Sequence, residues 1–177
     1  MYKKKYGKMT VSAWLNAEME QSRSALMILG GVLSLGIGVF VRFLVGAPYR
    51  MILELGITEL LPPVWLMALL WSVTLFVIGS AGGFVLGYRT CGAEGEKYKG
   101  CMFFLLLLFL EMLWYPTFFA VGLVFVSALL SVLILCLSVA VTSCFYRVTK
   151  FAGMLLMLHD VWLVYMLILN FAILFRN

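Results

Sequence analysis

Five long runs of apolar residues, separated by short polar segments, make up most of the sequence. A helix that crosses the hydrocarbon core of a bilayer, about 30 Å thick, needs about 20 apolar residues at a rise of about 1.5 Å each. Five runs reach that length, at residues 25–45, 64–86, 101–119, 123–146 and 152–175. We therefore predict an all-α fold, an integral membrane bundle of five transmembrane helices.

The third and fourth spans come from one apolar stretch, residues 101–146, in which Glu111 is the only charged residue. This stretch is about twice as long as one crossing requires, so the chain has to reverse direction within it. Pro116 and Gly122 bracket the expected turn, because proline and glycine commonly interrupt or end helices.

The sequence divides into a mostly polar extension, residues 1–24, and one domain, residues 25–177. A cleaved signal peptide is the competing interpretation of the N-terminus, but its apolar part would be shorter than the first span. Val11, Trp14, Leu15 and Met19 fall near one helical face, which is typical of a helix lying on a membrane surface. A solvated tail is the alternative for this extension.

Composition excludes several classes of protein. The chain is 64% apolar and 12% charged, whereas soluble domains have about 45–50% apolar and about 25% charged residues. An ordinary soluble enzyme and a disordered chain are therefore excluded. The four cysteines form no CxxC pair or Cys/His cluster, so we expect neither a metal site nor a disulfide framework.

The positive charges indicate the orientation in the membrane. The net charge is +5, but the basic residues lie in short groups between the apolar runs, so no nucleic-acid partner is expected. With five spans, most of them fall on the side of the N-terminus: Lys3, Lys4, Lys5, Lys8, Arg23, Arg89, Lys97, Lys99, Arg147 and Lys150, against Arg42, Arg50 and Arg176. The positive-inside rule then predicts N-inside and C-outside, and we expect a bacterial cytoplasmic membrane.

Small residues recur at helical spacing in three spans. They are Gly30, Ser34 and Gly38 in the first, Gly79, Gly83 and Gly87 in the second, and Ser127, Ser131, Ser138 and Thr142 in the fourth. Such stripes let helix backbones approach closely, so we expect them to face protein. The second glycine stripe is also a candidate interface for a homodimer.

Three ionisable residues lie inside the predicted spans. An ionised group at the bilayer centre costs about 2.5–3.5 kcal/mol on insertion scales, so Glu111, His159 and Asp160 need partners or water. Counting about 1.5 Å per residue from the inner edge places all three at similar depths, roughly 11–15 Å. We expect one shared polar layer, which either joins two helices or serves a function.

Three tryptophans fall at mid-membrane depth, although tryptophan usually prefers the water interface, where Trp65 is expected. They are Trp71, Trp114 and Trp162. One face of the third span carries Leu107, Glu111, Trp114 and Phe118, and one face of the fifth carries His159, Trp162, Met166 and Asn170. If these faces meet, they enclose either an apolar ligand cavity with a few polar groups or a filled aromatic core.

Three segments resemble the TspO/MBR family, the tryptophan-rich sensory proteins related to the translocator protein or peripheral benzodiazepine receptor. Pro62, Pro63, Trp65 and Trp71 are similar to the block that opens the family's second helix. Residues 111–119, with Trp114, Pro116 and Phe118, are similar to its third-helix motif. Residues 155–162, followed by Tyr165, Leu169 and Asn170, are similar to its last helix, so the resemblance covers residues 49–177 in order.

The resemblance implies a five-helix bundle, often dimeric, whose pocket is closed by the loop after the first helix, here residues 46–61. Family members bind porphyrins and benzodiazepine-type ligands, animal members bind cholesterol, and some bacterial members are reported to degrade protoporphyrin in light. The tryptophans involved look like Trp71 and Trp162, which makes these two the catalytic candidates.

This sequence departs from the family pattern at several site positions. Glu111 replaces an asparagine, His159 a tyrosine and Leu75 a tyrosine, and Ile57, Thr58 and Leu60 stand where the family has Lys-Pro and Trp. A buried glutamate repels a porphyrin propionate unless it is protonated or paired with His159.

These observations lead to a prediction of function. The predicted ligand-binding residues are Trp65, Trp71, Glu111, Trp114, Phe118, His159, Trp162, Tyr165 and Asn170. The first hypothesis is a membrane sensor or regulator that binds a porphyrin, another flat tetrapyrrole or a sterol-like molecule, and that requires no cofactor. The alternatives are a light-dependent porphyrin-degrading enzyme and a small proton-coupled transporter using Glu111, His159 and Asp160. Haem ligation by His159 is disfavoured, because no second axial histidine exists.

Overall fold

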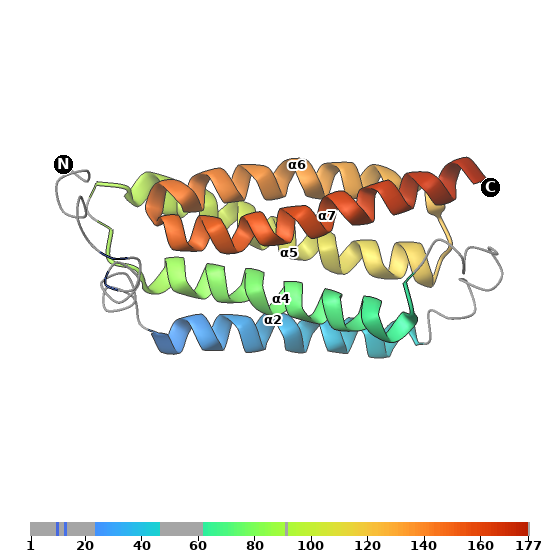
Figure 1. Ribbon diagram of the computed structural model, residues 1–177, viewed down its shortest axis with the longest axis horizontal. Helices are drawn as coiled ribbons and strands as arrows, with labels where there is room; N and C mark the ends of the chain where they lie inside the picture. The colour runs from blue at the N-terminus through green and yellow to red at the C-terminus, as the bar shows by residue number, and fades with distance from the viewer. Residues whose placement is uncertain (1–9, 11–12, 14–23, 47–61, 91, 177) are drawn as a thin grey trace.

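Five long helices make up the computed structural model, which describes residues 10, 13, 24–46, 62–90 and 92–176. They are α2 (Ser24–Val45), α4 (Val64–Gly87), α5 (Glu94–Phe119), α6 (Val124–Val148) and α7 (Lys150–Arg176), all aligned with the long axis of the molecule (Figure 1). Each is long and apolar enough to cross a bilayer. The predicted all-α bundle of five transmembrane helices is confirmed. The surface helix proposed for the N-terminal extension lies outside the described residues at all four of its apolar positions: Val11, Trp14, Leu15 and Met19.

The helices form a ring whose order differs from their order in the chain. α2 packs on α4, α4 on α7, α7 on α6 and α6 on α5, and α5 closes the ring against α2 and α4. In Figure 1 the pair α2 and α4 lies below the group α5, α6 and α7. Four of the five helices can therefore direct side chains toward one interior space.

Two helices begin two or more residues before the position that the apolar pattern predicts. α5 begins at Glu94 rather than residue 101, and α7 begins at Lys150 rather than residue 152. Glu94 and Glu96 lie in the first turn of α5, where a carboxylate is favoured by the partial positive charge of a helix N-terminus. Hydropathy identifies the part of a helix that contacts lipid, and these helices continue past it into polar turns.

The reversal between α5 and α6 lies where the sequence predicts it. Pro116 is in the last turn of α5, and its carbonyl accepts hydrogen bonds from the amides of Ala120 and Val121 at 2.9 and 3.0 Å. Gly122 follows with φ +73°, a left-handed conformation that costs glycine little. These two features end one span and allow the next to begin at Val124.

Backbone contact between small residues joins α2 to α4. A Cβ atom added at Gly79 would overlap the carbonyl oxygen of Gly30, and one at Gly83 would overlap that of Leu26. This confirms the prediction that these stripes face protein. It also shows that the suggestion of a homodimer interface at Gly79 and Gly83 is wrong, because α2 of the same chain covers them.

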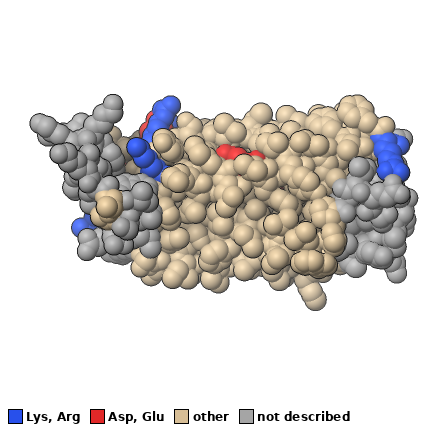
Figure 2. Space-filling model, viewed as in Figure 1, with Lys and Arg blue, Asp and Glu red and all other residues tan. Residues whose placement is uncertain are grey.

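The outer surface is largely apolar, and most of its charged residues lie at the two ends (Figure 2). Exposed leucine, isoleucine, valine and phenylalanine side chains cover α2, α5, α6 and α7. Figure 2 shows Lys and Arg near both ends of the molecule and one small acidic patch midway along it. At one end the Lys97 ammonium donates hydrogen bonds to the carbonyls of Leu86 and Tyr88 at 2.9 and 3.0 Å. These bonds give partners to two carbonyl groups at the C-terminal end of α4.

The α2–α4 contact makes a test of small-residue packing. We expect Gly79→Ala to reduce the free energy of unfolding by about 1–3 kcal/mol, the usual cost of overpacking, because its methyl group has no space. Gly36→Ala is the matched control, since Gly36 is on the same pair of helices but has no neighbour within 4 Å of an added Cβ. Thermal unfolding in detergent measures both; equal melting temperatures would contradict the close contact.

Candidate functional site: an aromatic cavity with a buried Glu–His pair

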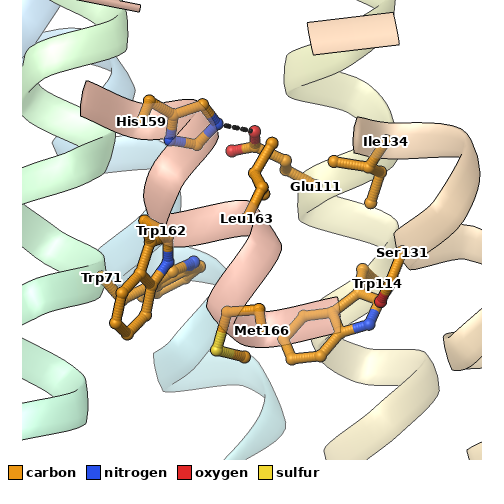
Figure 3. Close-up of a pocket in the computed structure, with 9 residues that line it drawn as sticks. All are labelled: Trp71, Glu111, Trp114, Ser131, Ile134, His159, Trp162, Leu163 and Met166. Carbon is orange, nitrogen blue, oxygen red and sulfur yellow. Dashed lines mark hydrogen bonds and ion pairs between the residues drawn. The ribbon is translucent and has the colours of Figure 1, made fainter. Parts of the chain in front are cut away.

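A cavity lies inside the ring, between α4, α5, α6 and α7. Its lining consists of Trp71, Glu111, Trp114, Ser131, Ile134, His159, Trp162, Leu163 and Met166 (Figure 3). The predicted faces of α5 and α7 therefore meet. In Figure 3 the Glu111–His159 bond lies toward one end of the cavity and the indole rings lie toward the other.

Glu111 and His159 form a buried pair across the cavity. The Glu111 Oε1 atom lies 2.7 Å from His159 Nε2, and the two residues are only 6% and 1% exposed. α5 and α7 are not neighbours in the ring, so this bond connects two helices with few other contacts. Pairing supplies each group with a partner that lipid cannot provide.

Every indole of the cavity is supported by a second aromatic ring. Trp71 stacks on Tyr115 with ring centroids 4.8 Å apart, and Trp114 stacks on Phe118 at 5.4 Å. Trp162 packs against Tyr165, also at 5.4 Å. Such ring pairs contribute about 0.5–1.5 kcal/mol beyond their buried area. The walls are thus held in defined orientations by residues behind them.

Two buried polar atoms of the lining residues have no hydrogen-bond partner among the described residues. They are Nε1 of Trp114 and Nδ1 of His159. Most buried polar atoms in folded proteins are paired, so an unpaired one calls for an explanation. Both belong to residues that border the cavity, where a polar atom of a bound molecule can pair with them.

The cavity is narrow. The space open to the centres of water-sized molecules is about 30 Å³, and all the free space between the lining side chains, including its opening to the outside, is about 420 Å³. The first figure corresponds to about two water molecules, whereas sites for drug-sized ligands span about 300–1,000 Å³. A larger guest therefore has to separate the walls, and the half-buried Trp71 and Trp162 are more free to move than the buried Trp114.

The structure brings together five of the nine predicted ligand-binding residues. Phe118 and Tyr165 lie behind the walls, and Asn170 is buried, donating to the carbonyl of Met166 at 2.8 Å. Trp65 is 68% exposed at the start of α4 and does not line the cavity. The expected lid lies outside the described residues except for Gly46, as do Ile57, Thr58 and Leu60.

Four lining residues are absent from the predicted ligand-binding residues, although Met166 was expected on the α7 face that borders the cavity. Ser131 and Ile134 come from α6, and Leu163 and Met166 from α7. The predicted hydroxyl stripe did place Ser131 toward protein, and its four members are buried. That stripe was the available signal that α6 contributes a wall, but nothing in it distinguishes a cavity from ordinary helix packing.

Asp160 follows His159 in α7 and so lies at a similar depth, but it does not join the Glu111–His159 pair. Its carboxylate instead accepts hydrogen bonds from Ser138 Oγ and, at 2.8 Å, from Thr142 Oγ1, both on α6. Consecutive residues of a helix are about 100° apart around its axis, so Asp160 faces a different neighbour from His159. The two hydroxyl groups give this carboxyl group hydrogen-bond partners that lipid cannot provide.

Comparison with known proteins identifies the family. The sequence model of the TspO/MBR family matches residues 31–176, which include every lining residue of the cavity. The chain belongs to the TspO/MBR family. This TspO/MBR protein is also 31% identical over 117 residues to the tryptophan-rich protein TspO of Chlorobaculum tepidum, an alignment that covers 66% of this chain and 72% of that protein.

Family membership confirms the resemblance and the general class. This TspO/MBR protein is a multi-pass integral membrane protein of a sensor or binding type. Two of the residues named in the sequence analysis as departures from the expected family pattern, Glu111 and His159, form the buried pair.

Removing one member of the pair tests its contribution to stability. We expect Glu111→Leu to reduce the free energy of unfolding by about 3–5 kcal/mol, the usual cost of leaving one partner of a buried pair alone. Glu111→Gln keeps an acceptor for His159 Nε2–H and should cost clearly less. Thermal unfolding of the two purified variants in the same detergent makes the comparison. Equal stability of the leucine variant and the original protein would show that the Glu111–His159 pair does not stabilise the bundle.

Proposed function

We propose that this TspO/MBR protein is a membrane receptor or sensor that binds a flat, mostly apolar ligand of the porphyrin type in the cavity between α4, α5, α6 and α7. The observation that carries this proposal is the convergence of Trp71, Trp114 and Trp162 on one cavity. Indole rings offer large flat surfaces at a small cost in conformational entropy, which suits stacking against a planar macrocycle.

The Glu111–His159 pair would orient the ligand. Because Glu111 already has a partner at 2.7 Å, its repulsion of an anionic ligand is weaker than that of an isolated carboxylate. A porphyrin propionate is still better placed away from it. The unpaired Nε1 of Trp114 offers a hydrogen bond to an acceptor atom of the ligand.

Ligand entry would require the walls to separate, because the cavity has room for about two water molecules in this conformation. Trp71 comes from α4 and Trp162 from α7, which are neighbours in the ring. We expect binding to displace one or both of these indoles. A protein that changes shape around a ligand is also suited to act as a sensor, because the bound and free states then differ.

Titration with protoporphyrin tests the proposed walls. We expect the double variant Trp71→Phe with Trp162→Phe to bind about tenfold more weakly, since two stacking contacts of about 0.5–1.5 kcal/mol each are reduced. The shift of the porphyrin absorption band measures binding without depending on the number of remaining tryptophans.

Trp65→Phe is the matched control, because Trp65 is exposed and does not line the cavity. It should bind as the original protein does. Undiminished binding by the double variant would contradict the assigned walls, and absence of porphyrin binding by the original protein would contradict the proposal. A sterol that displaces porphyrin would extend the ligand class, and light-driven loss of the porphyrin band would show turnover.

The orientation in the membrane is part of the same proposal. The described basic residues favour the end at which α5 and α7 begin, where Lys97, Lys99, Arg147 and Lys150 lie. By the positive-inside rule this end faces the cytoplasm of a bacterial cell, with the N-terminus inside.

Single cysteines at the two ends test this orientation. Tyr98 is 74% exposed near the start of α5, and Val121 is 65% exposed in the α5–α6 turn. In a variant without native cysteines, we expect a membrane-impermeant thiol reagent to label Val121→Cys in intact cells and Tyr98→Cys only after permeabilisation. The reverse pattern would overturn the orientation.

A further inference from the structure

A second polar site lies between α6 and α7, outside the ligand cavity. Ser138 and Thr142 each donate a hydroxyl hydrogen bond to a different carboxylate oxygen of Asp160, Thr142 at 2.8 Å. None of the three residues lines the cavity. The two hydroxyl residues are buried, whereas Asp160 is half-buried and remains partly accessible from outside.

Asp160 is accessible at the depth of the lipid chains. It lies ten residues along α7 from Lys150, roughly 15 Å at the helical rise, or about half the hydrocarbon thickness. Figure 2 shows an acidic patch at mid-length among residues other than Lys, Arg, Asp and Glu. Among the described helices, Glu111 and Asp160 are the acidic residues that lie far from the helix ends. Of these two, Asp160 is the more exposed.

Two opposing influences act on this carboxyl group. Surrounding lipid favours its neutral, protonated form, because hydrocarbon cannot solvate a charge. The two hydroxyl donors favour its ionised form, because both hydrogen bonds end on carboxylate oxygens. The lipid and the two hydroxyl groups therefore act in opposite directions on this carboxyl group.

Hydroxyl groups can support both forms. A hydroxyl donates one hydrogen bond and also accepts, and its hydrogen rotates to suit its neighbour. When Asp160 gains a proton, its O–H can donate to the oxygen of Ser138, whose own hydrogen can turn to a backbone carbonyl of the preceding turn, as Ser131 does toward Ser127 in the same helix. No polar atom of the cluster then loses its partner.

We propose that Asp160, together with Ser138 and Thr142, forms a reversible proton-binding site that faces the lipid and is separate from the ligand cavity. Binding adds one proton to one carboxylate oxygen and changes no other bond. Because α6 and α7 both contribute walls to the cavity, the proton is taken up where the two helices are joined.

Among the described residues, no other ionisable side chain forms a hydrogen bond or ion pair with Asp160. On α7, His159 points to the cavity and pairs with Glu111 of α5. α4, on the other flank of α7, carries no Asp, Glu, Lys, Arg or His from Val64 to Gly87. The remaining titratable residues of α6 and α7 are Cys136, Cys144, Tyr146 and Tyr165, with Arg147, Lys150 and Arg176 at the helix ends. Among the described contacts, Arg147 pairs with Glu96, 3.5 Å away.

A hydrophobic carbodiimide tests the site in the full-length protein reconstituted in liposomes. Dicyclohexylcarbodiimide reacts with a protonated carboxyl group from the lipid phase: the acid oxygen bonds to the central carbon of the reagent, the proton moves to a nitrogen, and the acyl group then migrates to nitrogen. The stable adduct contains all the atoms of both reactants, so peptide mass spectrometry locates it. We expect labelling of Asp160 that decreases as the pH is raised.

The hydroxyl pair predicts a second result. In the double variant Ser138→Ala with Thr142→Ala the ionised form loses both donors, so we expect about tenfold more adduct than in the original protein at the same alkaline pH. Asp160→Asn should remove the adduct. Ser127→Ala should leave it unchanged, because this hydroxyl of the same stripe bonds to the carbonyl of Val124 and not to Asp160. Elution of each variant as the same folded species in size-exclusion chromatography makes the comparison valid.

Three outcomes would overturn the proposal. They are no adduct on Asp160 at any pH in the original protein, labelling that does not change with pH, and labelling whose pH dependence is the same in the double alanine variant. The labelling of the original protein requires no substitution, so a variant that fails to fold leaves the first two outcomes decisive. Porphyrin binding is not part of this test, so its result is independent of the ligand cavity.

Discussion

Lipid gives transmembrane helices no hydrophobic reason to associate, because a leucine side chain contacts lipid as favourably as it contacts another helix. The bundle therefore depends on close backbone packing and on a small number of polar contacts. Three types of contact fulfil this role: the glycine contact between α2 and α4, the hydroxyl–carboxylate contact between α6 and α7, and the Glu111–His159 bond between α5 and α7. Each joins a different pair of helices, so together they connect much of the ring.

Aromatic rings serve two purposes in the interior. Trp71, Trp114 and Trp162 border the cavity, and Tyr115, Phe118 and Tyr165 pack behind them. The tryptophan rings provide flat surfaces toward the cavity, and the rings behind them restrict the movement of the tryptophans. A cavity of about 30 Å³ and walls of this kind indicate a site that is shaped in advance but too narrow for a large ligand. Opening it costs aromatic contacts, which a planar ligand can replace with its own.

The fold was largely predictable from the sequence, because its main determinants are local. The length of apolar runs fixes the number of spans, and Pro116 and Gly122 fix the reversal between α5 and α6. The convergence of the mid-membrane tryptophans also followed from counting residues along straight helices. The order of helices around the ring could not be predicted in this way, because it depends on which faces fit together. Consequently Ser131 and Ile134 were absent from the predicted site, and the contacts of Asp160 with α6 were not predicted.

The bond between Glu111 and His159 has a mechanical consequence. It spans the interior of the ring and links α5 to α7, two helices with few other contacts between them. A molecule wider than the present space must either bind beside the Glu111–His159 bond or break it. If the bond stays, the bundle keeps its diameter and the indole rings of the cavity move aside. If the bond breaks, α7 is no longer joined to α5 and the ring of helices expands. The size of a guest would thus select between a local adjustment and a movement of a whole helix that extends to both membrane surfaces.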